Sequence, residues 1–286
     1  MDPDLVALLR CPVCSDALAL TDRTARCPRG HAYDLAKQGY LNLLPSASTG
    51  IEGDSAAMVG ARTVFLGGRH YAPIRDALIL AAVDLQPDDV VVEVGAGTAY
   101  YLAGVLGQAP GRRALALDVS RYAARRAAKV DPRIGSVVCD AWKELPLLDH
   151  TAQLMLNVFA PRNAAEMARV LAPDGTLLVV TPNPQHLAEL VGVLGLVTVD
   201  EEKERRLQES FAGVFTRTGS EVIEDVMRLD RAAVEQLVLM TPSARHVNYR
   251  ELLGQIALLP EPSIVTLSVT LSTWRRTSTT HQPPAS

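Results

Sequence analysis

The chain has 286 residues, of which 48% are hydrophobic and 21% charged, and a formal net charge of −4. This composition is that of a globular protein with a sizeable core, and the negative balance argues against strong non-specific attraction to nucleic acid. No apolar run reaches the roughly 18 residues of a membrane-spanning helix, and the acidic start with its short apolar run does not fit a signal peptide. We therefore expect a cytoplasmic protein without a membrane or DNA partner.

The basic residues are strongly biased towards arginine. Only four of the 28 are lysine, namely Lys37, Lys129, Lys143 and Lys203. A GC-rich genome is the simpler explanation of this bias. Arginine also makes bidentate phosphate contacts and stacks on bases, so the bias is compatible with an RNA partner.

The first 45 residues contain a compact cluster of metal-binding residue types. Cys11 and Cys14 form a CxxC pair, and after twelve residues Cys27 and His31 follow as a second pair. Three thiolates and one imidazole complete a tetrahedral shell for a structural zinc ion, and a module this small has little core without a metal. A disulfide is not expected in the cytosol, and a redox CxxC would accompany a βαβ unit. We expect one structural zinc ion, Zn(2+), on these four residues.

The rest of the chain divides into three further zones. We expect a zinc-binding module at 1–45, a connector with a helix-like piece at 46–70, a main domain at 71–276 and a disordered polar tail at 277–286. The main domain alternates apolar runs with helical patterns, which indicates a parallel α/β sheet. The runs are "VVVEV", "ALALDV", "GSVVCD", "QLMLNVF" and "TLLVV", followed by helical stretches near 186–195, 202–212 and 231–238 and a β-rich run at 263–274.

A glycine-rich turn follows the first of these predicted strands. In "VVVEVGAGTAYYL" (90–102), Gly95 and Gly97 let the backbone approach a ligand closely, and Thr98 is placed to cap the helix that follows. Asp118 ends the next strand, about 20 residues further on, where a carboxylate suits the two hydroxyls of a ribose. The plainer alternative is that the glycines only make a tight turn and that Asp118 only caps a helix.

Two cofactors fit this arrangement. NAD would favour a third glycine at position 100, which is Tyr100 here. Glu93, directly before the turn, fits poorly beside a pyrophosphate but well beside a sulfonium or an amino group. The sequence therefore favours S-adenosylmethionine (S-adenosyl-L-methionine).

Two later strand ends reach the same edge of the predicted sheet. Asp140 in "VVCDAW" offers a carboxylate and neighbouring backbone to an adenine amino group. "LNVFAP" places Asn157, Phe159 and Pro161 where the transferred methyl group would meet its acceptor, because ligands of parallel sheets lie beyond the carboxyl ends of the strands. Cys139 is expected to be a small buried residue.

Several motifs together resemble the RlmA/TlrB family of 23S rRNA (guanine-N1)-methyltransferases. They are "CPVC…CPRGHAYDLAKQGYLNLLP", "GDSAAMVGAR…FL…HYAPIRDAL", "EVGAGTAYYL", "LDVS", "FAP" and "TPNPQHLAEL", in this order from residue 11 to about 245. The head signature, with "AKQGYLNLLP" after the cysteine cluster, is more specific than the glycine turn.

The resemblance implies a class I, Rossmann-like methyltransferase domain preceded by a small zinc ribbon, with S-adenosylmethionine as donor. The acceptor would be N1 of a guanosine in hairpin 35 of 23S rRNA, 748 rather than 745, in the branch linked to macrolide (tylosin-type) resistance. Members act as homodimers whose zinc modules help to form an RNA-binding cleft. By motif, Cys11, Cys14, Cys27 and His31 would bind zinc. Tyr71, Gly97–Thr98 and His186 would contact the donor.

The acceptor side is less defined by the sequence. Guanine N1 must lose a proton, and Asn157 with the backbone of Ala160–Pro161 is the candidate for holding the guanine edge as the catalytic group. Arginines crowd the zinc module as candidate RNA contacts, namely Arg23, Arg26 and Arg29, whereas the basic residues of 121–129 are expected to form a solvated helix face. The alternatives are a methyltransferase acting on a small molecule or a protein, and a non-catalytic RNA-binding assembly factor.

Overall fold

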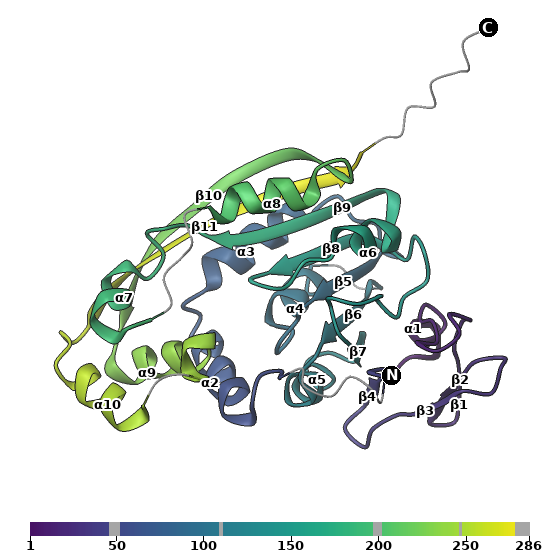
Figure 1. Cartoon of the computed structure of the whole chain (residues 1–286), viewed down its shortest axis with the longest axis horizontal. Coiled ribbons are helices and arrows are strands. Elements are labelled where there is room, and N and C mark those ends of the chain that lie inside the picture. The colour runs from purple at the N-terminus through teal and green to yellow at the C-terminus, as the bar shows by residue number, and fades with distance from the viewer. Residues whose placement is uncertain (46–51, 109–110, 197–201, 246–247, 278–286) are drawn as a thin grey trace, which may run out of the picture.

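The computed structural model describes residues 1–45, 52–108, 111–196, 202–245 and 248–277. Its centre is an eight-stranded sheet with the strand order β10-β11-β9-β8-β5-β6-β7-β4 (Figure 1). The strands of this sheet are β4 (Tyr40–Asn42), β5 (Val90–Val94), β6 (Arg113–Asp118), β7 (Ile134–Val138), β8 (Ala152–Val158), β9 (Leu171–Pro182), β10 (Phe215–Leu229) and β11 (Ser263–Arg276). The predicted tail, from residue 278 onwards, and residues 46–51 of the predicted connector lie outside the described residues.

Six strands of the sheet are parallel, and β10 and β11 complete it as an antiparallel pair beyond β9. All five residues of β5 and of β7 are buried, as expected of parallel strands covered on both faces. The predicted parallel α/β sheet is confirmed. The strands predicted from apolar runs are all present.

Helices cover both faces of the sheet and form two hydrophobic clusters with it. One face carries α2 (Ala56–Gly67), α3 (Ala72–Ala81), α4 (Tyr100–Leu106), α5 (Arg121–Ala127), α7 (Ala188–Leu194), α9 (Arg231–Leu239), the 3-10 turn η1 (Pro242–Arg245) and α10 (Tyr249–Ala257). The other face carries α1 (Pro3–Val6), α6 (Ala164–Val170) and α8 (Lys203–Phe211). No helix among the described residues is long and apolar enough to cross a bilayer.

The zinc module contributes one strand to this large sheet. It contains a small three-stranded sheet of β1 (Ala19–Thr21), β2 (Thr24–Arg26) and β3 (Ala32–Asp34). Its last strand, β4, instead pairs in parallel with β7 at the edge of the large sheet, with Leu41 opposite Val137. The buried side chains of Leu5, Leu9 and Leu41 belong to the same hydrophobic cluster as the sheet. The module and the main domain therefore share a core, and a boundary near residue 45 stays a prediction.

The last third of the chain contains two elements that the sequence patterns do not predict. The 15-residue strand β10 pairs along its length with β11, and α10 packs against α7 and α9. Both lie on the side of the molecule away from the zinc module (Figure 1).

Candidate functional site

The four predicted metal ligands converge at one point. Their ligand atoms all lie within 4.8 Å of one another, with Sγ of Cys27 3.3 Å from Nδ1 of His31 and 3.6 Å from Sγ of Cys14. A tetrahedral zinc ion with Zn–S bonds of about 2.3 Å needs sulfur atoms about 3.8 Å apart. The cluster therefore fits a zinc ion held by Cys11, Cys14, Cys27 and His31.

The surroundings of this cluster also fit a closed structural site. The hydroxyl of Tyr33 lies 3.3 Å from Sγ of Cys11, where it can donate a hydrogen bond to a metal-bound thiolate. With three sulfurs and one nitrogen, the shell has no open position for a substrate. Zinc at this site stabilises the fold. The fourth cysteine, Cys139, is buried elsewhere, as the sequence predicted.

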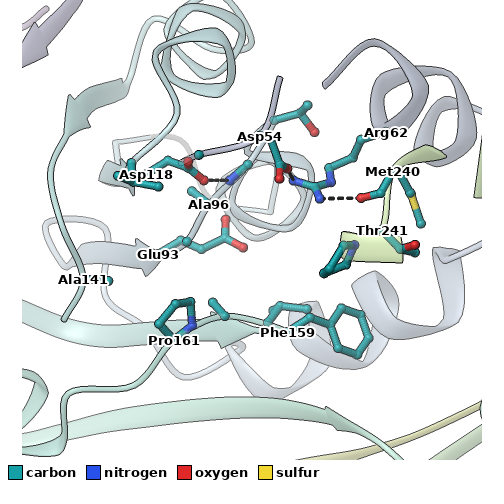
Figure 2. Close-up of a pocket in the computed structure, with 18 of the residues that line it drawn as sticks. Asp54, Arg62, Glu93, Ala96, Asp118, Ala141, Phe159, Pro161, Met240 and Thr241 are labelled. Atoms are coloured by element: carbon teal, nitrogen blue, oxygen red, sulfur yellow. Dashed lines mark hydrogen bonds and ion pairs between the residues drawn. The ribbon is translucent and has the colours of Figure 1, made fainter. Parts of the chain in front are cut away.

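A cavity of about 550 Å³ lies at the carboxyl ends of β5, β6, β7 and β8. Segments from four parts of the chain line it: residues 52–54 with Arg62, the turn after β5, the strand ends at 117–119, 139–142 and 158–161, and a far wall at 186–187 and 240–243. Figure 2 shows these walls facing one another around an open centre. Eight of the nine predicted cofactor residues line this cavity, namely Tyr71, Glu93, Gly95, Gly97, Thr98, Asp118, Asp140 and His186.

The turn after β5 requires its glycines. Gly95 has φ +71°, and a Cβ added there would lie 2.4 Å from Cβ of Ala160. Gly97 also has a left-handed backbone, with φ +54°. The expectation that Thr98 caps α4 is wrong, because the cap residue is Ala99 at φ 59° and no side chain caps the helix. The turn is instead held in place by a side chain that lies outside it.

Asp118 holds the turn in place. Its Oδ2 accepts a hydrogen bond from the amide of Gly97 and its Oδ1 one from the amide of Ser120, each at 2.8 Å. Burial raises the pKa of Asp118, while these two amide bonds oppose the rise. Ser120, rather than Asp118, caps α5, through its contact with the amide of Ala123. Asp118 thus lies beside the glycine turn on the cavity wall, where the ribose of a nucleoside ligand is expected.

Glu93 is buried and aimed into the cavity (Figure 2). Its Oε2 has no hydrogen-bond partner among the described residues. Burial raises the pKa of Glu93 well above its ordinary value, and repulsion from Asp118 adds to the rise. An unpaired buried carboxylate is costly, so a cationic ligand group here would be stabilised by Glu93.

Tyr71 and His186 form the opposite wall. The Tyr71 hydroxyl lies 3.2 Å from Nε2 of His186. The amide of Ser268 donates to Nδ1 of the same ring, so the neutral imidazole carries its proton on Nε2 and donates it to Tyr71. The ring of Phe159 stacks on His186 at a centroid distance of 6.0 Å. Phe159 has φ 53° and remains 40% exposed, so the chain holds an aromatic ring at the mouth of the cavity.

The structure does not favour the predicted role of Asn157. Its side chain is fully buried and does not line the cavity. Nδ2 donates to the carbonyl of Pro161 at 2.8 Å, and Oδ1 accepts from Nε of Arg162. Because side chains alternate along a strand, Asn157 turns towards the loop that it braces while Val158 turns towards the cavity. Asn157 therefore shapes the loop, and its position argues against a catalytic or cofactor contact.

Asp54 and Arg62 are cavity residues that the sequence did not reveal. The guanidinium of Arg62 lies 2.5 Å from Oδ2 of Asp54 and donates to the carbonyl of Met240 at 2.8 Å. It also packs over Gly97, so it joins the connector, the glycine turn and the segment after α9 (Figure 2). Both residues lie in the motif "GDSAAMVGAR", but the motif alone does not predict that their side chains form an ion pair.

The arginines of the zinc module do not line the cavity. Arg23 is exposed and donates to the carbonyls of Leu35 and Ala36. Arg29 pairs with Asp16, and Arg26 is exposed at the end of β2. Their contact with RNA stays a prediction.

The sheet order, the glycine turn with Asp118, and a cavity at the carboxyl ends of the strands define a class I, S-adenosylmethionine-dependent methyltransferase, here carrying a zinc ribbon. The sequence profile of the RlmA N-terminal zinc ribbon matches residues 9–48. The 23S rRNA (guanine(748)-N(1))-methyltransferase of Streptomyces fradiae is 46% identical over 278 residues, covering 96% of this chain and 99% of the relative. A Micromonospora griseorubida protein, named for the same reaction without a nucleotide position, is 45% identical over 96% of this chain and 99% of its own. The chain belongs to the RlmA/TlrB family of 23S rRNA (guanine-N1)-methyltransferases.

Solved structures agree on the fold. A chain of the Haloferax volcanii complex between the Trm112 methyltransferase activator and a methyltransferase superposes with a TM-score of 0.54 at 18% identity, over 80% of this chain and all of that one. The MccD protein superposes with a TM-score of 0.50 at 16% identity, over 71% of this chain and 96% of that one.

Proposed function

We propose that this protein transfers a methyl group from S-adenosylmethionine to N1 of guanosine 748 in hairpin 35 of 23S rRNA. The observation that carries the proposal is the cavity in which the glycine turn, Asp118 and the unpaired carboxylate of Glu93 face one space. The kinship with the Streptomyces fradiae enzyme, at 46% identity over nearly the whole chain, supports the acceptor and its position.

The residues of the cavity match the parts of the donor. The turn at Gly95 and Gly97 lets the backbone approach the ligand, and Asp118 offers its carboxylate to the ribose hydroxyls. Glu93 would hold the cationic end of the donor, where its unpaired oxygen would gain a partner. Asp140 and its neighbours after β7 line the region left for the adenine.

When bound, S-adenosylmethionine supplies an electrophilic methyl group on a sulfonium. Transfer would form a new bond between guanine N1 and the methyl carbon as the S–C bond breaks and leaves its electron pair on sulfur, and the N1 proton would be lost to solvent. The protein mainly positions the two reactants for this in-line displacement. The exposed ring of Phe159 lies at the mouth of the cavity, where it can stack on a guanine that has left its helix.

Kinship supports the proposed position of the guanosine and the proposed biological role. The relative whose name gives position 748 is 46% identical, which supports 748 over 745. Methylation there would give tylosin-type macrolide resistance. The same resemblance supports a homodimer, and a ribosomal RNA substrate supports a location in the cytoplasm.

Label transfer tests the proposed reaction. Purified protein is incubated with tritiated S-adenosylmethionine and 23S rRNA from a strain that lacks the modification, with 16S rRNA and RNA-free mixtures as controls. The proposal expects incorporation approaching one methyl group per 23S rRNA and none into the controls. Labelling of a small molecule or protein, with none in 23S rRNA, would contradict it.

A further inference from the structure

The outer face of α5 carries a stripe of basic residues. Arg121, Arg125 and Lys129 are spaced four residues apart, at and just beyond this helix, and so lie on one side of it. All three are exposed, and the 53% exposed ring of Tyr122 stands beside Arg121.

These three cations have no acidic partner among the residues that the structure describes. None of the ion pairs within the described ranges involves Arg121, Arg125 or Lys129. Many other surface arginines are neutralised, as in the pairs Arg113–Asp4, Arg217–Glu204 and Arg245–Glu52. In a chain with a net charge of −4, α5 thus keeps a local excess of positive charge.

One end of the stripe lies at the rim of the cavity. α5 begins directly after Ser120, whose hydroxyl donates to the carbonyl of Asp54 at 2.6 Å. Gly53 is packed so closely on Ser120 that an added Cβ would lie 2.7 Å from its Cα. Because Gly53, Asp54 and the exposed Glu52 all line the cavity, Arg121 stands next to its opening.

The other end of the stripe reaches the zinc module. Ala128 lies against Gly39, with 3.8 Å between its Cβ and the position of a Cβ added to Gly39. The same turn carries the exposed Lys37. Arg23 donates to the carbonyls of Leu35 and Ala36, directly before Lys37. From Arg121 to Lys129 the stripe is about 12 Å long at 1.5 Å per residue.

We propose that this surface, Arg121, Arg125 and Lys129 continued by Lys37 and Arg23, binds the phosphate backbone of the RNA strand that leads to the cavity. We call it the α5 strip. It rests on the proposed RNA substrate, and it replaces the expectation of a merely solvated helix face. The charge is complementary to phosphate, arginine matches phosphate geometry, and the strip leads from the zinc module to the opening where the target guanosine must enter. Tyr122 provides a ring on which an unpaired base can stack.

The test removes two charges of the strip. The double variant R121Q/R125Q is compared with R205Q/R206Q, which neutralises two exposed arginines of α8 at the far end of the sheet (Figure 1). Binding of a transcribed 23S rRNA fragment containing hairpin 35 is followed by fluorescence anisotropy over a series of salt concentrations. Donor affinity is measured by calorimetry, and circular dichroism verifies folding.

If the α5 strip binds RNA, R121Q/R125Q should bind the fragment about 10-fold or more weakly than the unaltered protein. The slope of log K against log salt should fall by about 1.4 to 1.8, at 0.7 to 0.9 per lost phosphate contact. KM for RNA should rise with kcat and donor affinity kept, and R205Q/R206Q should behave like the unaltered protein. Y122A should weaken binding and Y122F restore it, because stacking needs the ring.

Two results would overturn the proposal for the α5 strip alone. One is unchanged affinity and salt slope in R121Q/R125Q while the unaltered protein methylates the RNA, which leaves the proposed function intact. The other is an equal loss in R205Q/R206Q, which would make the effect one of total charge. An unaltered protein that binds donor but neither binds nor methylates the RNA would contradict the proposed function itself, and the strip with it.

Discussion

The hydroxyl of Tyr71 lies 3.2 Å from Nε2 of His186, although 115 residues separate them in the chain. Tyr71 precedes α3, His186 precedes α7, and the amide of Ser268 in β11 fixes the imidazole from its other side. Both side chains are buried on the cavity wall. One wall of the donor site therefore depends on three distant segments of the chain.

Tyr71→Phe should weaken donor binding while keeping the fold. The ring remains, but its hydroxyl is lost and Nε2 of the buried His186 is left without it. A net hydrogen bond contributes about 0.5–1.5 kcal/mol, so we expect S-adenosylmethionine affinity to fall about 2- to 10-fold by titration calorimetry. Tyr249→Phe, at a half-exposed tyrosine bonded to Glu235, is the matched control. Equal donor affinity in both variants would show that the Tyr71–His186 contact is not part of the donor site.

Glu93 should couple donor binding to pH. Burial raises its pKa well above the ordinary value, so ionising it opposes folding, and the free enzyme loses stability as pH rises from the ordinary range towards the raised pKa. A cationic donor favours the ionised form. Binding should therefore release a proton and tighten as pH rises over this same range.

Glu93→Gln separates these two effects. The variant should be more stable than the unaltered protein at neutral pH, with a flatter dependence of Tm on pH, yet bind donor at least about 10-fold more weakly. Calorimetry in buffers of different ionisation enthalpy should find proton release abolished. Glu221→Gln, on the exposed face of β10, should change none of these. Unaltered proton release in the Glu93 variant would assign the linkage to another group.

Gly95→Ala and Gly60→Ala should act in opposite directions. At Gly95 the backbone is left-handed and the new Cβ would lie 2.4 Å from Cβ of Ala160, so the turn must shift; we expect a lower Tm and about 10-fold or greater loss of donor affinity. At Gly60, inside α2, no heavy atom lies within 4 Å of the new Cβ. There alanine should stabilise by about 0.5–1 kcal/mol with donor binding unchanged. A tolerated Gly95→Ala would refute the tight packing of the turn.

Removing zinc should unfold more than the zinc ribbon. Structural zinc contributes about 10–16 kcal/mol in small modules, and Leu5 and Leu41 of this module share a core with the sheet. Elemental analysis should find one zinc per chain, lost in Cys14→Ser together with a marked fall in Tm and rapid proteolysis within residues 1–45. Cys139→Ser, at a buried cysteine outside the cluster, should keep its zinc. Full zinc content in Cys14→Ser would exclude this ligand set.

Features that depend on neighbours in the chain were predictable from the sequence. The zinc ligands lie within 21 residues, and the glycine turn and Asp118 sit at successive strand ends whose spacing the α/β pattern fixes. The contacts of Arg62 with Asp54 and with the carbonyl of Met240 depend on how α2 meets the segment after α9, and no local pattern contains them. Asn157 was placed at the right strand end but with its side chain on the wrong side of the strand.

The strand β10 was missed for a related reason. Its residues "FTRTGSEVIEDVMRL" are mostly exposed, with buried side chains at Phe215, Ile223, Met227 and Leu229. This spacing lacks the strict alternation of a half-buried strand. Its extended form follows from pairing with the long, largely buried β11, which is a tertiary effect.

Primer extension through hairpin 35 tests the central claim most directly. 23S rRNA from a strain lacking the modification is treated with the protein and S-adenosylmethionine and then reverse transcribed, since a methyl group on guanine N1 blocks Watson–Crick pairing. We predict a new stop caused by guanosine 748 and 1-methylguanosine in the digested RNA, both absent when S-adenosylmethionine is omitted and both weaker with the Gly95→Ala variant at a limiting donor concentration. Donor binding and label transfer without a stop in hairpin 35 would contradict the assignment, and a stop caused by guanosine 745 would move the target to its neighbour.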